Sequence, residues 1–145
     1  MATLKTVSIN AKLQEGYKVE GMLGDRVLYV DQPKSGGTDA GPTPLEYFLL
    51  SLAGCIAIVS RIIANQKKIP FRSIELTIQG YLDLDALLGK MTETRAGFGG
   101  IEIKANIDAD MSAEEKMEFL HEVDKRCPLS DTIAHGTQIS LVLQD

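Results

Sequence analysis

The stretch from Gly41 to Cys55 reads GPTPLEYFLLSLAGC and predicts the start of a long apolar helix. Thr43 is a favourable N-cap, Pro44 suits the first helical position, and Glu46 completes a Thr-x-x-Glu capping box. We expect the helix to run to about Gln66 and to end in a lysine pair, whose charges suit the negative end of the helix dipole. The last residue of the quoted stretch is one of only two cysteines in the chain.

On both sides of this helix, apolar residues alternate with polar ones, which predicts strands. Before the helix we expect an antiparallel meander at 7–13, 17–22 and 27–30, then a surface loop at 32–42. After it we expect a long strand at 74–84, a loop with one helical turn at 86–99, a strand at 101–107, a helix opened by a capping box at 112–115 and a final strand at 139–143. Pro128 closes that second helix or starts a short one ending near Gly136. The order predicts a single α+β domain over residues 1–145, with antiparallel strands around a long buried central helix.

The bulk composition narrows the possible partners and the compartment. The formal net charge is −5, and no run of lysine and arginine is long enough to follow a phosphate backbone, which argues against nucleic-acid binding. Two cysteines form no disulfide scaffold, so a reducing, cytoplasmic setting is expected, and the first residues show no secretory signal. The longest apolar stretch, Tyr47 to Val59, falls short of the roughly 20 residues that a membrane span needs. We therefore expect a core helix and no membrane partner.

Cys55 lies among Leu52, Ile56 and Val59, and two interpretations are open. A free cysteine in apolar surroundings can simply be a core residue, with a raised pKa and little reactivity. Gly54 points the other way, because glycine inside a helix costs about 1 kcal/mol relative to alanine. Some packing or access requirement at the helix surface would explain why a glycine stands there.

Cys127 follows the basic pair Lys125 and Arg126 and precedes Pro128. It can cap a short final helix, where the helix dipole and the adjacent cations would favour a thiolate. The alternative is a helix-terminus residue without chemical consequence. Neither cysteine is convincing alone, but two such cysteines far apart in sequence suggest a peroxidatic thiol and a resolving thiol.

The remaining candidates give weaker signals. Glu46 could accept hydrogen bonds from a substrate or a guanidinium, although its capping role alone would account for it. His121 and His135 could join the two cysteines in a zinc site, but none of the four has the spacing of a structural zinc motif. No metal or organic cofactor is therefore expected.

Both cysteine segments resemble those of the OsmC/Ohr family of thiol-dependent hydroperoxide reductases. The stretch quoted above is similar to the family's first-cysteine helix, and CPLSDTI, from Cys127 to Ile133, is similar to its second-cysteine segment. The resemblance implies an interlaced homodimer with two active sites at the subunit interface. It also implies that Cys55 attacks the peroxide and that Cys127 resolves the sulfenic acid as a disulfide, which an external dithiol then reduces.

Two positions depart from the peroxide-reducing branches of that family. Those enzymes place a glutamate ten positions before the first cysteine, where this chain has Leu45, with Glu46 one place later. They also hold the thiolate with an arginine from the loop or strands before the helix. The loop here offers only Lys34, which makes Arg26 the leading candidate and Arg126 the next. Arg61, six positions beyond Cys55 on the helix, is expected to face elsewhere.

The sequence therefore supports two main hypotheses. The first is a cysteine-based peroxidase that reduces organic hydroperoxides with Cys55, Cys127, Glu46 and Arg26 in its site. The second is a dimer of the same fold without efficient peroxidase activity, which binds a small apolar ligand or acts as a redox sensor. The departures favour the second hypothesis, whereas the presence of both cysteines favours the first.

Overall fold

This computed structural model describes residues 2–144 of the 145-residue chain. These residues form two compact units that divide between Phe48 and Leu49, here called the N-terminal unit and the C-terminal unit. The single domain expected over residues 1–145 stays a prediction. The α+β class is confirmed, with antiparallel strands and one long helix.

The N-terminal unit holds the predicted meander. Its strands are β1 (Asn10–Leu13), β2 (Val19–Leu23) and β3 (Arg26–Val30), which pair antiparallel in the order β1-β2-β3. Gly24 makes the tight turn between β2 and β3 with a φ of 63°, a conformation that glycine adopts without strain. The first strand is shorter than the predicted 7–13, because Asn10 pairs with Met22 and β2 extends only one residue further.

A buried carboxylate organises the loop that leads into the long helix. Asp31 accepts hydrogen bonds from the backbone amides of Gln32, Thr38 and Ala40, at 2.7, 3.2 and 3.1 Å, and from the Thr38 hydroxyl. These donors, the Thr38 hydroxyl first, lower the pKa of Asp31 to about 2. Gly37 lets the loop pass close by, since a Cβ there would lie 2.6 Å from an Asp31 carboxylate oxygen. The expected surface loop is thus a fixed turn around one acidic side chain.

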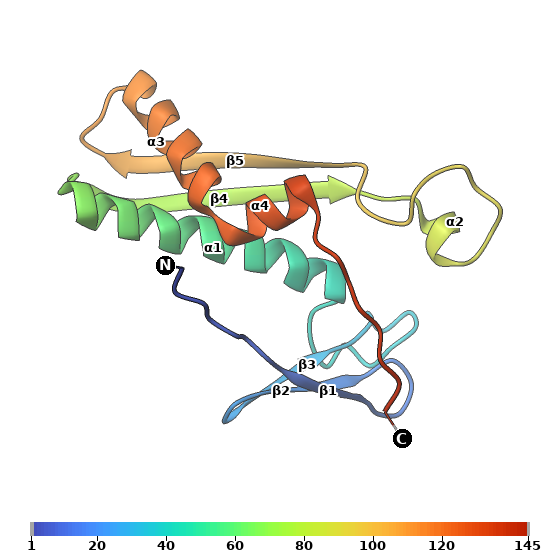
Figure 1. Cartoon of the computed structure of the whole chain (residues 1–145). Coiled ribbons are helices and arrows are strands. Elements are labelled where there is room, and N and C mark those ends of the chain that lie inside the picture. The colour runs from blue at the N-terminus through green and yellow to red at the C-terminus, as the bar shows by residue number, and fades with distance from the viewer. Residues whose placement is uncertain (1, 145) are drawn as a thin grey trace. The chain divides into compact units, whose positions relative to one another are not determined.

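Helix α1 (Pro44–Lys67) begins at the end of the N-terminal unit and continues into the C-terminal unit. There it is followed by β4 (Phe71–Tyr81), α2 (Leu84–Leu87), β5 (Gly100–Ala109), α3 (Ala113–Arg126) and α4 (Pro128–His135). β4 and β5 form an antiparallel hairpin, and Figure 1 shows α1 running alongside it. The second predicted capping box is confirmed, with Ser112 and Glu115 each accepting from the other's backbone amide.

The core of the C-terminal unit joins α1, the hairpin and α3. Its buried members include Ile63 from α1, Phe71 and Ile107 from the hairpin, and Phe119 and Val123 from α3. The Phe71 and Phe119 rings have centroids 5.7 Å apart. Fully burying side chains of this size contributes roughly 1.5–3 kcal/mol each.

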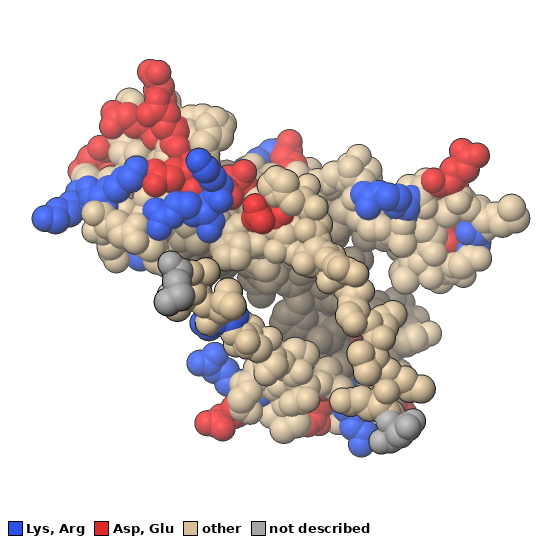
Figure 2. All heavy atoms as spheres, in the orientation of Figure 1, with Lys and Arg blue, Asp and Glu red and all other residues tan. Residues whose placement is uncertain are grey.

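On the face seen in Figure 2, acidic and basic side chains are intermixed over α3, whose outer surface is polar.

Two of the predicted strands are wrong in part or in full. β4 ends at Tyr81 and does not reach Leu84, because the Asp83 carboxylate accepts from the Asp85 amide and starts α2 instead. Residues 137–144 form no strand, although apolar residues alternate there. Ile139, Leu141 and Leu143 are 80–93% exposed, so this segment lacks the neighbouring strand that would pair with it.

By length and composition, α1 is apolar enough to cross a membrane, and it is the one helix in residues 2–144 of which this holds. The core helix of a soluble protein meets the same criteria. Leu52, Ile56 and Ile63 pack into the core described above, whereas Leu50 and Ile58 are 62% and 63% exposed. The central helix was expected to be buried, but in a single chain only one of its faces is buried and the other is exposed.

Candidate active site

The capping box at the start of α1 is present as predicted. The Glu46 carboxylate accepts from the Thr43 amide at 3.0 Å, and the Thr43 hydroxyl accepts from the Glu46 amide at 3.2 Å. The hydrogen bonds from Thr43 lower the pKa of Glu46. Glu46 thus has a complete structural role as an exposed, ionised cap, and its predicted role in catalysis stays a prediction.

Cys55 lies near the middle of α1, half-buried against the core of the C-terminal unit. A Cβ added to the neighbouring Gly54 would meet no heavy atom within 4 Å. No residue from 2 to 144 therefore makes the packing contact that the sequence suggested at Gly54. The helix surface beside Cys55 is open.

Cys127 sits at the corner between α3 and α4 and has no exposed surface. As predicted, it is the N-cap of α4, because its Sγ accepts from the backbone amide of Ser130 at 3.4 Å. Pro128 takes the first helical position, so the residue starts a short helix as well as ending the longer one. The helix runs from Pro128 to His135, close to the expected end.

The fold brings the two cysteines into direct contact. The Cys127 thiol donates to Cys55 Sγ across 3.0 Å, although 72 positions separate the two residues in sequence. Both cysteines are free thiols. The two sulfur atoms are thus close enough for a disulfide to form after a small movement. They come from different elements, Cys55 from α1 and Cys127 from the α3–α4 corner.

Burial decides the electrostatics of Cys127. Removal from water raises the pKa of this thiol, and the contact with Cys55 raises it further. The amides of Ser130 and Leu129 at the start of α4 act in the opposite direction but do not outweigh burial. The helix N-terminus lies where the sequence predicted it, but desolvation opposes the thiolate that it was expected to favour.

The candidate cations near the cysteines in sequence are engaged elsewhere. Arg61 donates to the carbonyl oxygens of Phe71 and Arg72, each at 2.8 Å, which agrees with the expectation that it faces away from Cys55. Arg126 donates to the Gln66 side chain at 2.9 Å and pairs with Glu122. Arg26 opens β3 in the N-terminal unit and is exposed. Its predicted role at Cys55 stays a prediction.

Two residues near Cys127 were missed by sequence reasoning. The Ser130 amide reaches the Cys127 sulfur, and the Ser130 hydroxyl donates to the Asp124 carboxylate. A sulfur N-cap is expected to bond the amide three positions on, so the spacing from Cys127 to Ser130 was an available signal. Asp124 carried no comparable signal, since it is one acid among many on α3.

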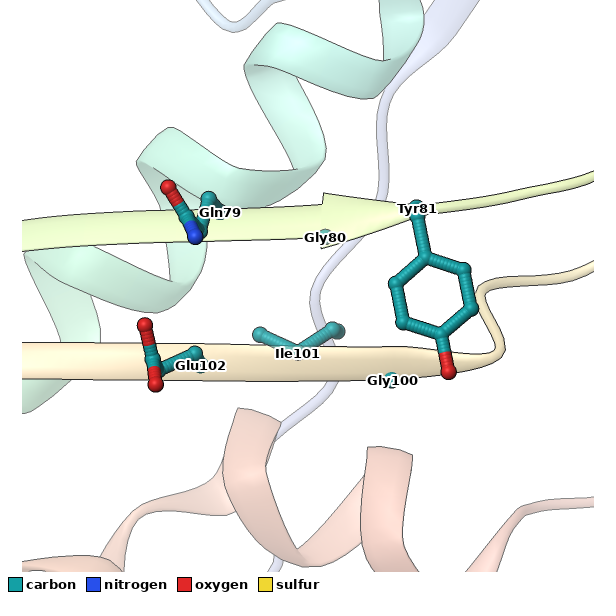
Figure 3. A pocket seen from close by; sticks show the side chains of 6 residues that line it. All are labelled: Gln79, Gly80, Tyr81, Gly100, Ile101 and Glu102. Carbon is teal, nitrogen blue, oxygen red and sulfur yellow. The ribbon is translucent and has the colours of Figure 1, made fainter.

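Two hollows lie in the C-terminal unit. One of 520 Å³ lies at the end of the β4–β5 hairpin, lined by Gln79, Gly80, Tyr81, Gly100, Ile101 and Glu102 (Figure 3). Neither cysteine lines it. A smaller cavity of 200 Å³ lies between α1, β5 and α3 and is lined mainly by apolar side chains, with His121 and Asp124 also lining it. Among residues 2–144, no group of three or more His, Cys, Asp or Glu side chains is arranged to hold a metal ion.

Comparison with known proteins identifies the family of this chain. The profile of the family described as OsmC-like protein matches residues 36–142. A hydroperoxide reductase from Mycoplasma genitalium is 28% identical over 137 residues, covering 92% of this chain and 89% of that protein. Among solved structures, an OsmC-like protein from Mycoplasma pneumoniae superposes with a TM-score of 0.78 at 25% identity, covering 90% of this chain and 88% of that one. An organic hydroperoxide resistance protein from Legionella pneumophila has a TM-score of 0.68 at 24% identity, covering 91% of both chains, and shares the fold. The chain belongs to the OsmC-like protein family.

Proposed function

We propose that this protein is a cysteine-based peroxidase that reduces organic hydroperoxides, with Cys55 as the attacking thiol and Cys127 as the resolving thiol. The observation that carries the proposal is the 3.0 Å contact between the two free sulfurs. The names of the relatives, hydroperoxide reductase and organic hydroperoxide resistance protein, support the same class of substrate. Free thiols in contact also fit the reducing cytoplasm, where we place the protein.

The first step uses the sulfur that is half open to solvent. The Cys55 thiolate attacks the terminal peroxide oxygen, the O–O bond breaks, and the alkoxide leaves and takes up a proton to become an alcohol. The Cys127 thiol donates to Cys55 Sγ, and a thiolate at Cys55 accepts that hydrogen bond. The product at Cys55 is a sulfenic acid.

The second step forms the disulfide. The Cys127 sulfur attacks the Cys55 sulfenic sulfur, the S–O bond breaks, and the hydroxide leaves as water with the proton from Cys127. An external dithiol then reduces the disulfide by thiol–disulfide exchange and is itself oxidised. Because Cys127 is fully buried, a large reagent reaches Cys55 more easily than Cys127, in keeping with these two roles.

The proposal also assigns roles to Arg26 and Glu46, which belong to the N-terminal unit. The family resemblance supports Arg26. The other two candidate arginines, Arg61 and Arg126, already donate hydrogen bonds from their guanidinium groups to backbone and side-chain oxygens. Glu46 would act as an ionised acceptor at the start of α1 while it caps the helix. Lysine could not replace a planar guanidinium at such a site.

One equivalent of an alkyl hydroperoxide is expected to convert Cys55 and Cys127 into one intramolecular disulfide per chain. The rate of disulfide formation should rise with pH through the neutral range, because the raised pKa of Cys127 leaves little of the attacking thiolate there. Peptide mapping gives the product, and rapid quenching at several pH values gives the rate. Independent over-oxidation of each thiol, without a disulfide, would contradict resolution by Cys127.

A homodimer forms part of the proposal. Leu50 and Ile58 expose apolar surface on α1, Gly54 leaves room between them, and the apolar residues of the segment at 137–144 are also uncovered. A second copy that packs against α1 and pairs with the C-terminal segment would cover both surfaces.

Light scattering at micromolar concentration is therefore expected to find a dimer. Ile58→Glu should weaken it roughly a hundredfold or more, because it buries an unpaired charge. Asn65→Glu adds the same charge to an exposed polar position of α1 and serves as the control. A stable wild-type monomer at that concentration, or equal dimerisation of both variants, would exclude packing through this face of α1.

The second candidate function is binding of a small apolar ligand by the same fold, without efficient peroxide turnover. The apolar cavity of 200 Å³ between α1, β5 and α3 favours it, as does the commitment of Glu46 to its cap. A pure binding protein, however, needs neither cysteine. The oxidation experiment separates the two, since a binding protein would leave both thiols unreacted by one equivalent of peroxide.

A further inference from the structure

The corner between α3 and α4 is held together through Cys127 itself. Its backbone amide donates to the Asp124 carbonyl at 3.3 Å, and its own carbonyl accepts from the Asp131 amide at 3.0 Å. Its sulfur accepts from the Ser130 amide at 3.4 Å. The position and direction of the buried sulfur therefore depend on how the first turn of α4 sits against the last turn of α3.

Asp124 contacts this corner through both its backbone and its side chain. Its carbonyl holds the Cys127 amide, and its carboxylate accepts from the Ser130 hydroxyl. Ser130 in turn directs its backbone amide at the Cys127 sulfur. The Asp124–Ser130 contact lies at the exposed edge of the corner, where a polar pair contributes little to global stability. Its effect on geometry can thus be tested without unfolding the protein.

We propose that Asp124 is a positioning residue for disulfide formation, acting through Ser130 to aim the Cys127 sulfur at Cys55. This inference rests on the proposed function. The two sulfurs must close from 3.0 Å to the roughly 2.05 Å of a disulfide bond while the corner stays formed. We call the hydrogen bond from the Ser130 hydroxyl to the Asp124 carboxylate the tether. Without the tether, the amides at the start of α4 lose their fixed arrangement and the Cys127 side chain gains other rotamers. An intramolecular attack is sensitive to this, since a misplacement of about 1 Å can cost about a hundredfold in rate.

Loss of the Asp124 charge and loss of its hydrogen bond are expected to change the rate of disulfide formation in opposite directions. A carboxylate near a thiol disfavours the thiolate, so loss of the charge alone would speed the attack by Cys127. Loss of the tether would slow it. Asp124→Ala removes both the charge and the acceptor, whereas Asp124→Asn removes the charge and keeps an oxygen that accepts from Ser130.

The experiment follows the full-length protein after one equivalent of alkyl hydroperoxide, by trapping sulfenic acid and quantifying the disulfide over time. In Asp124→Ala, sulfenic acid is expected to live roughly tenfold longer than in wild type, with more sulfinic acid at excess peroxide. Asp124→Asn should resolve at least as fast as wild type. Asp131→Ala is the matched control, because it removes an acid from the same corner whose side chain pairs with His135 instead.

Wild-type or faster resolution in Asp124→Ala would overturn the inference, as would equal slowing in Asp124→Asn or Asp131→Ala. If Asp124→Ala does not fold, Ser130→Ala removes the same hydrogen bond while keeping the Ser130 amide, and it must show the same delay. Failure of the proposed function looks different, since wild-type protein itself would then form no Cys55–Cys127 disulfide.

Discussion

Cys55→Ser is expected to abolish peroxide turnover, whereas Cys127→Ser should complete one oxidation and then stop. A serine hydroxyl at position 55 is not ionised near neutral pH, and removing a nucleophile costs roughly a thousandfold or more in rate. In Cys127→Ser the sulfenic acid on Cys55 lacks the sulfur that lies 3.0 Å away, so it should persist long enough to be trapped. Stopped-flow peroxide consumption and dimedone labelling separate the two behaviours.

The serine variants are conservative for the fold, which keeps the comparison clean. Serine is among the best N-cap residues, so Cys127→Ser should preserve the start of α4 that the cysteine sulfur now caps. Thermal unfolding midpoints within a few degrees of wild type would verify this. Sustained turnover by Cys127→Ser, with the same reductant and no trapped sulfenic acid, would mean that another group resolves Cys55. Turnover by Cys55→Ser would move the attacking thiol to Cys127.

Local signals predicted most of the helices and strands. The capping boxes at Thr43 and Ser112 depend on residues three positions apart, and both are formed as expected. The strand predicted through Leu84 is present, but its predicted end was wrong because a local competitor, the Asp83 cap, was overlooked. The C-terminal segment failed for the opposite reason, because alternation at 139–143 specifies a strand only when a neighbour pairs with it.

The candidate site was less accessible to sequence reasoning. Neither Cys55 nor Cys127 alone has a local pattern that predicts their contact; the two cysteine settings taken together and the family resemblance suggested it. The charge state of Cys127 depended on burial, which is a property of the assembled core and outweighs the helix N-terminus that the sequence revealed. The hydrogen bond from Ser130 to Asp124 likewise joins two helices, α3 and α4, that meet at Cys127.

Arg26→Met is expected to slow the first oxidation by roughly tenfold or more. A thiol without a stabilising partner is only a few per cent thiolate at pH 7, so complete ionisation is worth about thirtyfold in rate. If Arg26 supplies the cation, its removal should forfeit most of that factor. Arg26→Lys should recover only part of it, because an ammonium cannot reproduce the planar, bidentate guanidinium. The measurement is the second-order rate of alkyl hydroperoxide consumption in single-turnover experiments.

Lys34→Met is the matched control, because Lys34 is the cation in the loop before α1 and carries no proposed role. Both variants remove one positive charge, so a general change in surface potential would slow them equally. An unchanged rate in Arg26→Met would exclude Arg26 as the activating group. If wild-type protein also consumes alkyl hydroperoxide no faster than free cysteine does, the departures at Leu45 and in the loop have removed the peroxidase chemistry. The second candidate, a ligand-binding protein of the same fold, would then replace the peroxidase proposal, and the apolar cavity between α1, β5 and α3 favours it.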